Sequence, residues 1–270
     1  ALYISLGCSA ENIILASRNI GYNADLKIEK DTGGVDYISI KLQYDSAAQK
    51  DDLFNYIEKR QVTRNAYDDT SIASQDLKQL IDAAEFKGVR IRFFSSQEEI
   101  NQLKPFIIEG SNLQFQKKAF VDELVSWIRF SKKEVEKKKD GIWHASMGMP
   151  GVGRTMGNLI LKKFVGAKSE AKRWKKMIRS TPTFILFLAE KNDVAHWVNT
   201  GRAFQRFGLM ATELKINHAH VNMPCEEIEV RKKMALALGI EKDHPLLLVR
   251  LGYSKRMPYS YRRPVEEVLG

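Results

Sequence analysis

The segment RQVTR places two arginines and a threonine, Arg60, Thr63 and Arg64, within five positions. A phosphate dianion is best held by fixed cations with planar, bidentate geometry and by a hydroxyl donor, and arginine supplies this cation better than lysine. The segment follows an expected helix over 51–60, so a short turn would bring all three groups to one ligand. The alternative is a basic helix end that the helix dipole stabilises without a ligand.

The stretch GMPGVGRT, residues 148–155, has the two glycines and the closing threonine of a nucleotide-binding phosphate loop, with Arg154 in place of the lysine. Such a loop needs a buried strand before it and a helix after it. The upstream residues KKKDGIWHASM are polar and charged, and the best Walker B candidate, FILFLAE, carries Glu190 in place of the aspartate. These three departures argue against an ATPase, and the glycines predict a flexible loop.

Metal chemistry finds little support in the sequence. His218 and His220 would share one face of an extended segment near Cys225, but a third convergent ligand is not evident. The second cysteine, Cys8, is far away and neither belongs to a CxxC motif, so we expect two reduced thiols.

Composition limits the class of protein. A chain of 270 residues with 44% hydrophobic residues can bury one large core or two coupled ones. The net charge of +10 lies largely in 131–140 and 168–176, where acidic residues interleave at helical spacing, so we expect solvated faces and no nucleic-acid partner. The longest apolar run, 184–189, is too short for a membrane helix, and the N-terminus lacks the layout of a secretion signal, which together predict a cytoplasmic protein without a membrane partner.

An alternation of helices and strands must position these residues, which indicates an α+β fold. Apolar periodicity predicts a first helix that ends at Gly21 and a helix over 71–86 capped by Ser74. The remaining expected helices cover 51–60, 97–108, 115–137, 194–214 and 225–238, and the expected strands cover 35–44, 89–95, 181–190 and 244–253.

The two ends of the chain contain an internal repeat. GCSAENIILASRNIGY (7–22) aligns without gaps on GRAFQRFGLMATELKI (201–216), and a strand of the same apolar pattern follows each segment. In these strands Ile38, Ile40, Leu42 and Tyr44 correspond to Leu247, Val249, Leu251 and Tyr253. The repeat predicts two related halves about a pseudo-two-fold axis.

Three segments in their order resemble the nitroreductase family of flavoproteins: 52–86 with its RxS/TxR arrangement, GRAFQRFGLMATELKINHAHVNMPCE (201–226), and RLGYSKRMPYSYRRPVEEVL (250–269). The repeat makes the chain most similar to the duplicated, Acg-type branch, in which two fused units mimic a dimer. This resemblance implies mixed, mainly antiparallel sheets flanked by helices. It also implies that 1–50 is the C-terminal part of a first half, that 51–270 is the second half, and that about 138–180 is a lid insertion.

The resemblance implies FMN as the cofactor, with no catalytic side chain because the flavin carries the chemistry. The implied phosphate ligands are Arg60, Thr63, Arg64 and one of Arg262 and Arg263, with Arg262 favoured; the alternative for the last two is a solvated tail. Asn222 and Met223 would lie at the N5 and O4 edge of the flavin, or in an ordinary loop. The chain opens directly into a helix without a methionine, so we expect that residues before Ala1 are missing. The flavin-contacting Pro-Ser and Asn-Gln-Pro-Trp segment of the branch is absent: such residues would complete the FMN site, whereas a protein that begins at Ala1 would lack half of it.

The implied activity is that of an NAD(P)H-dependent oxidoreductase that reduces nitroaromatics or quinones by a ping-pong mechanism. The alternative is a non-catalytic protein of the same fold that binds or sequesters flavin. Either protein would be a monomeric pseudo-dimer or a homodimer.

Overall fold

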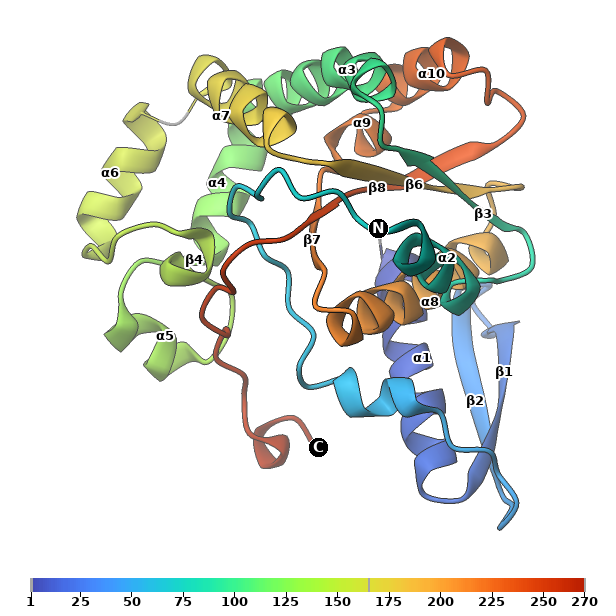
Figure 1. The fold of residues 1–270 in the computed structure, drawn as a ribbon. Coiled ribbons are helices and arrows are strands. Elements are labelled where there is room, and N and C mark those ends of the chain that lie inside the picture. The colour runs from blue at the N-terminus through green and yellow to red at the C-terminus, as the bar shows by residue number, and fades with distance from the viewer. Residues whose placement is uncertain (1, 165, 270) are drawn as a thin grey trace.

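In the computed structural model, which describes residues 2–164 and 166–269, an antiparallel sheet in the order β3-β6-β8-β7 forms the centre of the fold (Figure 1). Its strands are β3 (Val89–Phe94), β6 (Thr183–Ala189), β8 (His244–Gly252) and β7 (Asn217–His220). Strand β6 is buried over its full length, which explains its unbroken apolar sequence. Alternate side chains of β6 therefore enter two separate cores.

Helices cover both faces of this sheet (Figure 1). One face packs against α3 (Gln97–Gln116), α7 (Ala167–Arg179), α9 (Met223–Glu226) and α10 (Ile228–Ala237), in a core that includes Leu186 and Leu248. The other face packs against α2 (Ser74–Ala83) and α8 (Val194–Glu213), in a core that includes Phe187, Phe207 and Val249. The α+β class and the mainly antiparallel sheet are thus confirmed.

The N-terminal segment forms a second helix-and-strand unit beside α8. Helix α1 (Leu2–Asn19) packs along α8 and ends before Gly21, which has a φ of 84°. The strands β1 (Tyr22–Lys30) and β2 (Asp36–Tyr44) then form an antiparallel hairpin of their own. The predicted end of the first helix is therefore confirmed.

The β1–β2 hairpin has the same register as β7 and β8. Asn23 pairs with Gln43, and Asn217 pairs with Gly252. When the gapless alignment of the two helices is continued by one residue, Asn23 is the counterpart of Asn217, and the strand alignment makes Gln43 the counterpart of Gly252. The alignment from sequence therefore reproduces the pairing in both units.

The contact between α1 and α8 also repeats a pair of aligned positions. Glu11 lies 3.2 Å from the Arg206 guanidinium, and the Gln205 amide donates a hydrogen bond of 2.7 Å to Asn12. Glu11 aligns with Gln205, and Asn12 aligns with Arg206. Each contact therefore joins the first of these aligned positions on one helix to the second on the other helix.

Several expected elements differ from the structure. The helix expected over 51–60 is a short 3₁₀ helix, η1 (Asp52–Tyr56), and Ser74 is the first residue of α2, preceded by Ala73 without a side-chain cap. The 97–108 helix continues to Gln116, because its later residues Gly110, Ser111 and Gln114 are buried where α3 packs against neighbouring helices that include α9.

The region after α3 consists of short elements. The helix expected over 115–137 is divided into α4 (Lys118–Trp127) and α5 (Lys132–Lys138) by β4 (Ile128–Arg129). The glycine-rich region contains β5 (Ile142–Trp143), η2 (His144–Met147) and α6 (Arg154–Phe164), and η3 (Val265–Glu267) lies in the C-terminal tail. Among the described residues, none of the helices has the length and apolar character that crossing a membrane requires.

Candidate functional site

The segment that carries Arg60 and Arg64 is fixed to β7 through Thr63. The Thr63 backbone N–H donates to the His218 carbonyl at 3.0 Å, and its hydroxyl donates to the Asn217 side-chain oxygen at 3.2 Å. Thr63 is fully buried. Its hydroxyl therefore serves this anchor, while the two flanking arginines face a cavity.

A second anchor holds the same segment against β8. The Tyr67 hydroxyl donates to the Thr63 carbonyl at 3.0 Å, and the Arg250 guanidinium lies 4.0 Å from the centre of the Tyr67 ring. Arg250 also donates to the Asn65 carbonyl at 2.7 Å. This buried arginine therefore positions the loop through a cation–π contact and a hydrogen bond.

The C-terminal tail runs beside this segment. The Gln61 amide donates to the Met257 carbonyl at 2.9 Å, and the Tyr259 hydroxyl donates to the Lys59 carbonyl at 3.0 Å. Further along the tail, the Tyr261 ring packs edge-on against Trp143, with 5.4 Å between ring centres. The tail and the glycine-rich region therefore line one cavity together with the segment that carries Arg60 and Arg64.

That space is a cavity of about 240 Å³ with a strongly cationic lining. Its polar lining side chains include three arginines and three hydroxyl groups: Arg60, Arg64, Arg262, Ser146, Tyr259 and Ser260. No carboxylate lines it, and within the described ranges no hydrogen bond or ion pair engages any of the three guanidinium groups. We call it the arginine cavity.

Arg60 is half-buried and bears an electrostatic cost in the arginine cavity. Burial lowers the pKa of its guanidinium, and the nearby charge of Arg262 lowers this pKa further. A buried cation without a partner is unfavourable, and a bound anion would offset the cost. The arrangement is therefore suited to an anion of more than one charge.

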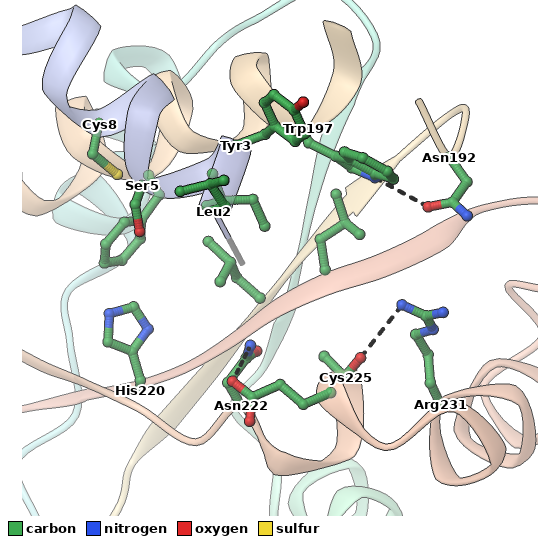
Figure 2. Close-up of a pocket in the computed structure, with 15 residues that line it drawn as sticks. Leu2, Tyr3, Ser5, Cys8, Asn192, Trp197, His220, Asn222, Cys225 and Arg231 are labelled. Atoms are coloured by element: carbon green, nitrogen blue, oxygen red, sulfur yellow. Dashed lines mark hydrogen bonds between the residues drawn. The ribbon is translucent and has the colours of Figure 1, made fainter. Parts of the chain in front are cut away.

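A larger cavity of about 720 Å³ lies between α1, α8, α9, α10 and the ends of β7 and β8 (Figure 2). Its lining includes two aromatic pairs. The Tyr3 and Trp197 rings are stacked with 5.8 Å between centres, and the Phe204 ring lies 4.8 Å from the His220 ring. A cavity of this size and aromatic content suits a planar organic ligand, and we call it the aromatic cavity.

His220 connects the two cavities electrostatically. The His220 side chain is exposed to the cavity, but the protein around it reduces its hydration and, together with the charges of Arg60 and Arg64, lowers the pKa of His220 to about 4, so its imidazole is neutral near pH 7. The neighbouring His218 is fully buried, and burial and Arg60 lower its pKa well below the usual range. The sequence pointed to His220 only as a possible metal ligand, and its place in the aromatic cavity was missed because the short polar segment NHAH carries no clear strand signal.

Asn222 lines the aromatic cavity, where its side-chain oxygen accepts from the Leu248 N–H at 3.0 Å. Met223 lines neither cavity and packs against the core, with its backbone close to Gly110. Arg263 is exposed and also lines neither cavity. The structure therefore brings Arg60, Arg64 and Arg262 together, places Asn222 separately, and leaves Thr63, Met223 and Arg263 outside both linings.

The Arg154 side chain of the GMPGVGRT stretch is held by contacts within the protein. Its guanidinium donates to Glu134 at 2.7 Å and to the Ile128 carbonyl at 2.9 Å. It lines neither cavity, whereas Gly141, Ile142 and Ser146, from earlier in this region, line the arginine cavity. Over the described residues, no group of three or more His, Cys, Asp or Glu side chains could hold a metal ion.

A comparison with solved structures found several similar chains. An iodotyrosine deiodinase bound to FMN and 3-iodo-L-tyrosine is 13% identical over 78% of this chain and 95% of its own, with a TM-score of 0.51. A nitroreductase-like protein from Bacillus cereus is 13% identical over 82% and 96%, with a TM-score of 0.49. A nitroreductase with bound FMN from Bacteroides fragilis is 16% identical over 80% and 95%, with a TM-score of 0.46.

A search of curated proteins found no match. The model of the Nitroreductase family matches residues 57–253, which is more than half of the chain and includes both anchors of the arginine segment. The chain therefore belongs to the Nitroreductase family.

Proposed function

We propose that the protein binds FMN and acts as an NAD(P)H-dependent oxidoreductase of the nitroreductase type. The observation that carries this proposal is the arginine cavity, in which Arg60, Arg64 and Arg262 meet without an acidic partner beside a larger aromatic cavity. Family membership supports FMN as the anion, and the similar iodotyrosine deiodinase binds FMN.

The residues present fit this cofactor. The FMN phosphate carries close to two negative charges, and the three unpaired guanidinium groups supply the charge and the bidentate donors that it needs. The isoalloxazine ring would occupy the aromatic cavity next to His220 and Asn222. A neutral His220 can donate or accept one hydrogen bond there without adding charge beside the reduced ring.

When bound, FMN would supply the redox chemistry, taking hydride equivalents from NAD(P)H and passing them to a nitroaromatic or a quinone in a ping-pong sequence. The side chains of this chain would bind and orient the ring and keep water from it. Phe204, which packs against His220, forms an apolar wall for that task.

We also propose that 1–50 is the C-terminal part of one nitroreductase-like half and that 51–270 is the other half. The equal hairpin registers and the reciprocal contacts of Glu11 and Asn12 support this division. Helix α1 would then complete the site of the second half, since Leu2, Tyr3, Ser5 and Cys8 line the aromatic cavity. The 138–180 region would act as a lid over the arginine cavity.

Such a chain would work as a monomeric pseudo-dimer, with a homodimer as the alternative, and we propose a cytoplasmic location for it. Sedimentation equilibrium distinguishes the two assemblies, because a monomer mass of 30.9 kDa would support the pseudo-dimer. A mass of twice that value would favour the homodimer.

The test of cofactor binding is a titration of FMN into the protein, followed by quenching of flavin fluorescence. R60Q and R262Q should each weaken FMN binding by about 10- to 100-fold, since each removes a charge-assisted hydrogen bond to the phosphate. R263Q is the matched control, because it removes the same charge from the next residue, which lies outside the cavity. Protein that stays colourless with excess FMN, or equal losses in R262Q and R263Q, would contradict the proposal.

The test of catalysis is stopped-flow addition of NADPH to the flavin-loaded protein, then of a nitroaromatic compound. Bleaching of the flavin spectrum by NADPH and its return on addition of the acceptor support the oxidoreductase. Flavin that binds tightly but is not reduced supports the alternative, a non-catalytic flavin-binding or sequestering protein.

A further inference from the structure

Arg231 lies in the first turns of α10 and lines the aromatic cavity at the end away from His220, with Asn222 and Cys225 between them (Figure 2). Its guanidinium is half-buried and donates one long hydrogen bond of 3.5 Å to the Cys225 carbonyl. No ion pair to this guanidinium occurs within residues 2–164 and 166–269. The aromatic cavity therefore contains a cation without a carboxylate partner.

The acidic residues around Arg231 are engaged elsewhere. Glu226, which also lines the cavity, accepts from the Gln114 amide at 2.7 Å and from the Asn222 amide at 3.2 Å. Glu227 pairs with Lys117 at 2.7 Å, and Glu229 pairs with Lys232 at 2.9 Å. Arg231 is thus left available to a ligand, although three carboxylates lie within five positions of it.

One wall of the same cavity is aromatic. The Trp197 indole N–H donates to Asn192 at 3.0 Å, which fixes the ring, and Tyr3 stacks against it. Leu246 and Leu247 add an apolar surface. An apolar cavity with one unpaired guanidinium is complementary to a flat ring that carries one anionic group, because the guanidinium meets the anion bidentately while the ring excludes water.

We propose that the aromatic cavity selects acceptors that are planar arenes with a carboxylate, bound with the carboxylate on Arg231 and the ring along Tyr3 and Trp197. The role of these arenes as electron acceptors rests on the proposed oxidoreductase function. Their binding at Arg231 is measured independently of that function. The anionic groups of NAD(P)H share part of this chemistry, so the experiment includes that ligand.

The test is isothermal titration calorimetry of the FMN-loaded protein with para-nitrobenzoate and with its neutral analogue para-nitrobenzamide. Wild type should bind the carboxylate at least about tenfold more tightly, in line with a charge-assisted hydrogen bond. R231Q should abolish the preference and leave the affinity for the amide within about twofold, and R231K should restore part of the preference. K232Q is the matched control, because it removes the same charge from the adjacent, exposed residue of α10.

Equal binding of the two arenes to wild type, no binding of either, or the same loss in R231Q and K232Q would overturn the proposal. So would an R231Q variant that weakens binding of NADP⁺, the oxidised form that cannot reduce the flavin, but keeps the carboxylate preference. FMN affinity and the circular dichroism spectrum are recorded for each variant. If wild type binds no FMN, the same titrations on the flavin-free protein show whether the carboxylate preference stands although the proposed function has failed.

Discussion

Gly7 of α1 and Gly201 of α8 pack against each other's helix at the same aligned position. A Cβ atom at Gly7 would overlap the Val198 carbonyl, and one at Gly201 would overlap the Ile4 carbonyl. Because Ile4 aligns with Val198, the two contacts join equivalent aligned positions of the two helices. This close approach places the first turns of α1 at the aromatic cavity, so the crossing of the two helices shapes the candidate site.

The crossing predicts that G7A destabilises the protein by about 1–3 kcal/mol, because the obstructing atoms are backbone and cannot turn aside. Combining G7A with G201A should cost less than the sum of the two, since the first change already separates the helices. Chemical denaturation measures both effects. G153A is the control, because a Cβ at that position meets no atom within 4 Å, and a loss in G153A as large as in G7A would refute this explanation.

Arg154 is predicted to matter for stability and not for FMN. Its contacts with Glu134 and the Ile128 carbonyl are made within the region after α4, so R154A should lower the free energy of unfolding by about 1–2 kcal/mol. FMN affinity should stay within about twofold of wild type. K132A, at an exposed lysine of the same region, controls for lost surface charge. A tenfold loss of FMN affinity in R154A alone would place the loop at the cofactor.

Thr63 is a candidate phosphate ligand from the sequence, and its hydroxyl is hydrogen-bonded to Asn217 in the structure. T63V should therefore lower the free energy of unfolding by about 1–2 kcal/mol, since it leaves the buried Asn217 oxygen without a donor. T63S should retain most of this stability. FMN titrations decide between the two roles: a loss of affinity in T63V as large as that in R60Q would make the hydroxyl a ligand.

His220 predicts a pH dependence of stability. The unfolded chain takes up a proton near the usual histidine pKa of 6.5, whereas the folded protein does so near 4. The unfolded state therefore binds more protons between these values, and His220 makes folding progressively less favourable as pH falls through that window. His218 acts in the same direction.

Urea denaturation of wild type and H220Q at about pH 7 and about pH 5 checks this effect. H220Q should lose less stability than wild type over that interval, while the contributions of His218 and the carboxylates remain in both proteins. An equal or larger loss in H220Q would mean that the neutral form of His220 is not favoured in the folded protein.

Local patterns predicted the elements whose burial is encoded in adjacent residues. The run TFILFLA predicted β6, and the apolar spacing of α1 and α8 predicted both helices with ends near those observed. Strands β1 and β7 were missed for different reasons. In β1 the apolar residues Tyr22, Ala24, Leu26 and Ile28 alternate with polar ones, which is a strand signal that the predicted elements left out. Strand β7 is only the short polar segment NHAH, and its pairing with β8 supplies what its own sequence does not show.

Some residues of the candidate site could likewise be predicted from the sequence, and others depended on tertiary structure. The sequence named Arg60, Arg64 and Arg262 from residue type and family resemblance, but it could not show that Arg263 falls outside the cavity. That outcome depends on how the tail lies along the 59–61 segment. Hydrogen bonds between residues about 200 positions apart in the chain set this arrangement. The free guanidinium of Arg231 was also missed, since its availability depends on the partners that Glu226, Glu227 and Glu229 find elsewhere.

The sequence by itself determined the helix and strand periodicities, the family resemblance and the alignment that pairs Gly7 with Gly201, because each of these is written in neighbouring residues or in a linear comparison. Tertiary structure decided which cations share a cavity and which cations are paired with carboxylates. Electrostatic pairing depends on distances of a few ångströms between residues far apart in the chain, and only the packed backbone sets those distances.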